Sequence, residues 1–133
     1  MKSRALATAV LLAAVLIVVD AASADSNAVR WFHSPSGNIE CEVASHDARG
    51  TYAYCQTSSP LQTARLTGNG RTSVCANRAC PVGDGPTNAT TLLYGHSVRV
   101  GVFRCASAVT GIRCTVIANG HGFRIAREGI VTF

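Results

Sequence analysis

Residues 38–44 read NIECEVA, so Ile39, Cys41 and Val43 alternate with two glutamates. This period of two places the apolar side chains on one face of an extended chain and the carboxylates on the other. The stretch therefore predicts a half-buried β-strand whose two glutamates face water.

The segments that follow predict two hairpins. Residues 51–56 are rich in Thr and Tyr and form the expected partner strand, so a disulfide between Cys41 and Cys55 would tie the first hairpin together. Residues 62–67 and 71–75 flank Gly-Asn-Gly, whose glycines supply the positive φ of a tight turn.

The C-terminal half shows the same alternation of apolar and polar residues. We expect a long strand over residues 97–105 with a bulge at Gly101, a strand over 110–118, and a turn at 119–122. Two short extended segments follow, and the Pro- and Gly-rich residues 81–88 predict a loop. With no helical periodicity in this part of the chain, the expected fold is all-β, a small antiparallel barrel or sandwich.

The N-terminus has the pattern of a secretory signal peptide. A basic start is followed by the uncharged apolar residues 5–19 and by Ala22-Ser-Ala24, a small-x-small cleavage pattern. Fifteen apolar residues are short of the ~20 that span a bilayer core. We therefore expect residues 1–24 to be removed, leaving one soluble domain over residues 25–133 that has no transmembrane segment.

All six cysteines lie after the expected cleavage point, which favours disulfides in an exported chain. Fifteen pairings are possible, and we favour bridges between sequence neighbours because each pair brackets turn-forming residues. The favoured pairs are Cys41–Cys55, Cys75–Cys80 and Cys105–Cys114. Zinc is disfavoured because no second tight cysteine pair faces the pair at 75 and 80.

Residues 34–43 and 107–116 resemble each other. Each has a small-residue turn that leads into Ile-x-Cys-x-Val. The likeness is compatible with a duplication or with one local solution used twice. If the two copies lay side by side, Glu40 or Glu42 would meet Arg113; register also places Arg113 and Arg124 on outward faces, without showing that they share one.

Several motifs resemble a family of exported actinobacterial proteins classed as a domain of unknown function. The opening motif is Phe32-His-Ser-Pro-Ser-Gly-Asn-Ile-x-Cys41, and the closing motifs are Gly111-Ile-x-Cys114 and Gly120-x-Gly-Phe-x-Ile125. The resemblance extends from about residue 32 to residue 133. It implies secretion and a small disulfide-bonded domain, and it transfers no catalytic residue.

Few residues suggest chemistry. His121 stands between two glycines in an expected exposed turn and is the best single candidate for a ligand-binding or acid–base group. Ser36, His121 and Asp47 could be drawn as a catalytic set, but the chain lacks a Gly-x-Ser-x-Gly elbow, and we assign no catalytic residue. Trp31 and its neighbour Phe32 are expected to pack at the domain edge or, if exposed, to mark a partner site. We expect no metal and no cofactor.

The expected function is a secreted or envelope-associated, non-enzymatic binding or structural module whose partner is unidentified. Residues 25–133 contain ten arginines and six acidic residues, a net charge of +4 that could attract anionic envelope components, although solubility and composition bias explain it more simply. The partner could equally be a protein. Nucleic acid is not expected, because no basic run occurs and the aromatic residues do not interleave with arginines.

Two alternatives remain open. A Cys75–Cys80 bridge would hold Arg78 on a short rigid loop, as secreted protease inhibitors present a basic residue to trypsin-like enzymes. A small hydrolase using His121 is the weaker alternative.

Overall fold

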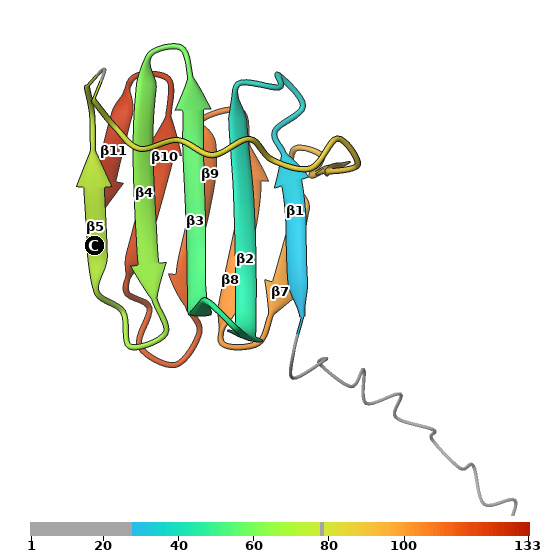
Figure 1. The fold of residues 1–133 in the computed structure, drawn as a ribbon, viewed down its shortest axis with the longest axis vertical. Helices are drawn as coiled ribbons and strands as arrows, with labels where there is room; N and C mark the ends of the chain where they lie inside the picture. Colours follow the sequence, from blue (N-terminus) through green and yellow to red (C-terminus); the bar gives the residue numbers. More distant parts are fainter. Residues whose placement is uncertain (1–27, 78) are drawn as a thin grey trace, which may run out of the picture.

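Two β-sheets stack face to face in a computed structural model, which describes residues 28–77 and 79–133 (Figure 1). Sheet A has the strand order β5-β4-β3-β2-β1-β6, and sheet B has the order β11-β10-β9-β8-β7. The described residues contain no helix, and the sheets form a sandwich rather than a closed barrel, which confirms the all-β prediction.

Neighbouring strands are antiparallel except for the short parallel pair β1–β6. The strands of sheet A are β1 (Val29–His33), β2 (Ile39–Asp47), β3 (Gly50–Ser58), β4 (Leu61–Thr67), β5 (Thr72–Cys75) and β6 (Thr90–Thr91). The strands of sheet B are β7 (Ser97–Val100), β8 (Phe103–Ala108), β9 (Gly111–Val116), β10 (Gly122–Ala126) and β11 (Gly129–Thr132).

Both predicted hairpins are present, as β2–β3 and β4–β5. The long strand expected over residues 97–105 is wrong, because the chain reverses at Gly101 and forms the separate strands β7 and β8. Gly101 has φ +53°, and a Cβ there would lie 2.2 Å from Ser45 Oγ of the opposite sheet. The glycine therefore serves a tight turn that packs against sheet A, and it does not mark a bulge.

The strand β1 was not expected from the sequence. Phe32 lies opposite Cys41 and is 2% exposed, so it belongs to the core and not to the domain edge. Trp31, its neighbour, points to the other side of the sheet, as the alternation of a strand requires.

Two disulfides occupy the centre of the sandwich. Cys41–Cys55 and Cys105–Cys114 each join directly opposite residues of adjacent strands, with a Cα–Cα distance of 4.1 Å. Sγ of Cys55 lies 3.9 Å from Sγ of Cys114, so the two bridges touch between the sheets. With Cys75–Cys80 at the end of β5, all three disulfides have the expected pairing, and they indicate an oxidising environment.

The two Ile-x-Cys-x-Val segments occupy β2 and β9, one in each sheet. Each central cysteine has a phenylalanine opposite it on one neighbouring strand and a cysteine opposite it on the other. In sheet A the phenylalanine is on the preceding strand, and in sheet B it is on the following strand. In chain order the residues are Phe32, Cys41 and Cys55 in sheet A, and Cys105, Cys114 and Phe123 in sheet B. Because the copies lie in different sheets, the expected meeting of Glu40 or Glu42 with Arg113 is wrong.

The expected signal peptide, residues 1–24, lies outside the described residues. Within the described part, no helix is long and apolar enough to cross a membrane.

Candidate functional site: two opposite outer faces

The outer face of sheet B carries four arginines. Arg99 and Arg104 are directly opposite each other on β7 and β8, and Arg113 and Arg124 are directly opposite each other on β9 and β10. All four alternate with buried or half-buried residues, so they point away from the sandwich. The sequence could not show that Arg113 and Arg124 share a face, and the structure places them side by side. We call these four residues the arginine face.

These arginines have little to neutralise them. In the described part of the chain, the salt bridges are those of Arg49 on sheet A. Residues 89–133 contain five arginines and a single acidic residue, Glu128, which lies in the β10–β11 turn. The guanidinium of Arg113 instead lies 3.6 Å from the ring centroid of Phe133, and Arg124 Nη1 donates to the Thr110 carbonyl at 3.2 Å.

The outer face of sheet A differs from the arginine face, because the charged group at its centre, the carboxylate of Glu42, is shielded from solvent. Glu42 is only 6% exposed, so the expectation that it faces water is wrong. Its Oε1 accepts a hydrogen bond from the Tyr52 hydroxyl at 2.7 Å and also pairs with the guanidinium of Arg49. Arg65 covers the Tyr52 ring, with its guanidinium carbon 3.8 Å from the centroid. These neighbours shield a carboxylate that alternation alone would leave in solvent.

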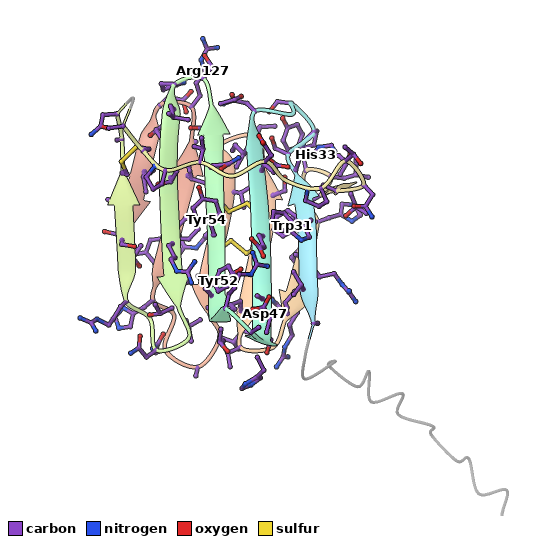
Figure 2. All side chains as sticks on the ribbon, viewed as in Figure 1. Trp31, His33, Asp47, Tyr52, Tyr54 and Arg127 are labelled. Carbon is purple, nitrogen blue, oxygen red and sulfur yellow. A yellow bond between two sulfur atoms is a disulfide. The ribbon has the colours of Figure 1, made fainter. Side chains whose placement is uncertain are left out.

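Burial and the hydrogen bond to Glu42 raise the pKa of Tyr52 to about 12. At the end of the same strand pair, the backbone N–H of Arg49 lowers the pKa of Asp47. Figure 2 shows Asp47 at one end of the face, with Tyr52 and Tyr54 along β3.

Residues 81–89, which we call the strap, cross this face of sheet A between β5 and β6 (Figure 1). The hydroxyl of Tyr54 donates to the Pro81 carbonyl at 3.1 Å, and the amide of Gln56 exchanges two hydrogen bonds with Gly83, at 2.7 and 3.2 Å. A Cβ at Gly85 would collide with the Glu40 carboxylate, so a larger residue there would displace that side chain. The loop expected over residues 81–88 is thus fastened to the sheet.

A cavity of about 50 Å³ lies where the strap meets the sheet. It is lined by Trp31, Glu40, Cys41, Glu42, Tyr54, Gln56 and Gly83. Trp31 is half-buried there, so it does not form the flat exposed patch that a simple partner surface would have. Figure 2 shows Trp31 and Tyr54 on the strands that flank β2.

The other candidates from the sequence lie apart. His121 is exposed in the β9–β10 turn, where its N–H donates to Asn119 Oδ1 at 3.0 Å. Ser36 precedes β2 and Asp47 ends it, so the strand separates them and no Ser-His-Asp set forms. Arg78 lies outside the described residues. Among the described residues, no group of three His, Cys, Asp or Glu side chains could hold a metal.

The polar side chains of the opening motif, which begins at Phe32, form hydrogen bonds within the fold. Ser34 Oγ accepts a hydrogen bond from the N–H of Ile39 at 3.2 Å, and Asn38 Oδ1 accepts from the hydroxyl of Ser58 and the N–H of Ser59. The first bond closes the β1–β2 connection, and the two bonds of Asn38 join that connection to the β3–β4 turn. The side chains line a wide depression at this end of the sandwich, but their oxygens are already engaged by the protein.

Comparison with family models, with curated proteins and with solved structures finds no match for this chain.

Proposed function

We propose that this protein is an exported, non-enzymatic binding module that binds an anionic polymer of the cell envelope on the arginine face. The observation that carries the proposal is the pairing of Arg99 with Arg104 and of Arg113 with Arg124 across adjacent strands. Like charges directly opposite each other destabilise a sheet, so fold stability does not account for them.

A polymer with regularly repeated negative charges complements this arrangement. Adjacent strands are spaced by about 4.8 Å, so the two arginine pairs present neighbouring cationic side chains on one outer face. Guanidinium groups bind phosphate and carboxylate in a planar, bidentate manner, which suits a surface site without a deep pocket. Disulfides on both sheets support an extracellular or envelope location, where such polymers occur.

Binding of dextran sulfate by the oxidised protein, measured by isothermal titration calorimetry, tests the proposal. Replacing Arg113 and Arg124 together by alanine should weaken the affinity at least about tenfold, roughly 1.4 kcal/mol, and raising the salt concentration should weaken wild-type binding. Neutral dextran of the same length should not bind.

The matched control is the double variant Arg30→Ala/Arg71→Ala. Both residues are exposed, Arg30 on β1 and Arg71 in the β4–β5 turn, so the control has the same change in net charge but leaves the arginine face intact. If both double variants lose affinity equally, only net charge matters and the proposed site is wrong. Circular dichroism should show that both variants remain folded.

A second candidate, a protease inhibitor, is favoured by two hydrogen bonds among the described residues of the Cys75–Cys80 loop. Asn77 Oδ1 accepts from the N–H of Ala79 at 2.8 Å, and the N–H of Cys80 donates to the Asn77 carbonyl at 3.1 Å. Such internal bonds would reduce the entropy cost of presenting Arg78. Micromolar protein should then slow trypsin, and Arg78→Ala should abolish the inhibition; no effect of the wild-type protein would eliminate this function.

A further inference from the structure

The cavity under the strap combines two aromatic and two acidic side chains. Trp31 and Tyr54 come from the strands on either side of β2, and Glu40 and Glu42 come from β2 itself. Gly83 of the strap closes the cavity from above, and its two hydrogen bonds with Gln56 fix that cover. The site is therefore formed before any ligand arrives.

Glu42 has one oxygen that the protein does not use. Both Arg49 and Tyr52 bind Oε1, whereas Oε2 accepts no hydrogen bond from the described residues. A carboxylate offers about four lone-pair positions, and leaving them empty on a buried group is costly. In the described part, the only fully covered side-chain polar atom without a partner is Ser107 Oγ. Oε2 of Glu42 is thus still reached by open space.

Glu40 provides a second carboxylate with a fixed position. Gln56 Nε2 donates to its Oε2 at 3.2 Å, and Gly85 of the strap packs against its Oε1. Arg49 is the cation paired with Glu42, and among the described residues no arginine pairs with Glu40. The cavity lining thus includes two carboxylates and no arginine, because Arg49 pairs with Glu42 from outside the lining and Arg65 covers the Tyr52 ring.

We propose that this cavity binds a primary alkylammonium group, such as the end of an amine or lysine side chain. An ammonium has three hydrogens to donate, which suits Glu42 Oε2 and Glu40, and the faces of tryptophan and tyrosine attract cations. The cavity, of about 50 Å³, is small, which favours an ammonium on a single methylene over bulkier cations. A quaternary ammonium also has no hydrogen to donate to either carboxylate.

This site lies on sheet A, away from the arginine face, and it does not depend on the proposed function. The Arg113→Ala/Arg124→Ala variant should bind amines as the wild-type protein does. Failure of one proposal therefore leaves the other standing.

Trp31 is the only tryptophan of the chain, so its fluorescence reports on this cavity directly. Titration with methylammonium chloride at constant ionic strength should change the Trp31 emission with a saturable, millimolar midpoint. Sodium chloride and tetramethylammonium chloride should give no saturable change. A linear response shared by all three salts would overturn the proposal, and equal binding of tetramethylammonium would overturn the assignment to a primary ammonium.

The variants Glu42→Gln and Glu40→Gln remove one negative charge each, and Glu128→Gln, at an exposed turn, is the matched control. Methylammonium affinity should fall at least about fivefold in the first two variants and stay unchanged in the third. Glu40→Gln provides the test if Glu42→Gln does not fold, as judged by circular dichroism. Wild-type affinity in Glu40→Gln would contradict the proposed carboxylate contact.

Discussion

The strands β2 and β9 have the same inner face and opposite outer faces. Inside, each provides Ile-x-Cys-x-Val to the core, and the disulfides of Cys41 and Cys114 pack near each other. Outside, β2 has two glutamates, whereas β9 has Arg113 and Thr115. The acidic outer face is covered by a strap and by arginines, and the basic outer face is left open.

The comparison shows that the inward residues of these strands stabilise the sandwich, whereas the outward residues give each sheet a different surface. The inner residues of both strands are required by the same core, so they show the same alternation. On sheet A an outward charge is used within the fold, because Glu42 holds Tyr52 and Arg49. On sheet B the outward charges have no carboxylate partners among the described residues, and they remain available for a ligand.

The largest expected effect on stability comes from Glu42. Replacing it by alanine removes the acceptor of the buried Tyr52 hydroxyl and the partner of Arg49, so the free energy of unfolding should fall by about 2 kcal/mol. Arg113→Ala, an equally outward position, should change it by less than about 0.5 kcal/mol. Urea denaturation measures both, and equal losses would remove the distinction between the faces.

Tyr52 should make sheet A sensitive to alkaline pH. Its pKa is about 12 in the folded protein and about 10 in an unfolded chain, so the folded state holds the proton more tightly. The resulting stabilisation is present below pH 10 and is lost as the pH rises from about 10 to 12. The decline should be shallower in Tyr52→Phe when both proteins are unfolded with urea across this range; identical slopes would show that Tyr52 is not the group involved.

The smallest expected changes in the free energy of unfolding concern two serines that occupy matching positions beside β2 and β9. Ser34 and Ser107 are both buried, but Ser34 Oγ accepts the Ile39 N–H, whereas Ser107 Oγ has no partner among the described residues. Ser34→Ala should cost about 0.5–1 kcal/mol, and Ser107→Ala should be neutral or slightly stabilising. A larger loss in Ser107→Ala would reveal a bond that the structure does not contain.

Most of the fold could be predicted because alternation is a local signal. The cysteine pairing followed from the same signal, since each pair brackets a turn. Two errors came from contacts between distant segments. The sequence predicts a bulge at Gly101, because the contact of this glycine with Ser45 comes from the other sheet and leaves no local signal. The sequence likewise predicts an exposed Glu42, because only the folded chain brings Tyr52, Arg49 and the strap to this side chain.

The sites were less accessible to sequence reasoning. The alternation around Arg113 and Arg124 showed that each points outward, but their pairing depends on the register between β9 and β10. The cavity at Trp31 depends on the path of the strap, whose Pro and Gly residues predict a loop without a direction. Counting charges separately in residues 89–133, which contain five arginines and one acidic residue, would have indicated that sheet B is basic.

The most direct test of the central claim is an amide NMR titration of the oxidised protein with dextran sulfate. We expect the largest chemical-shift changes at the arginine face, on β7 to β10, with little change on β2 and β3. Changes centred on sheet A, or no changes anywhere, would contradict the assignment of the open basic sheet as the binding surface.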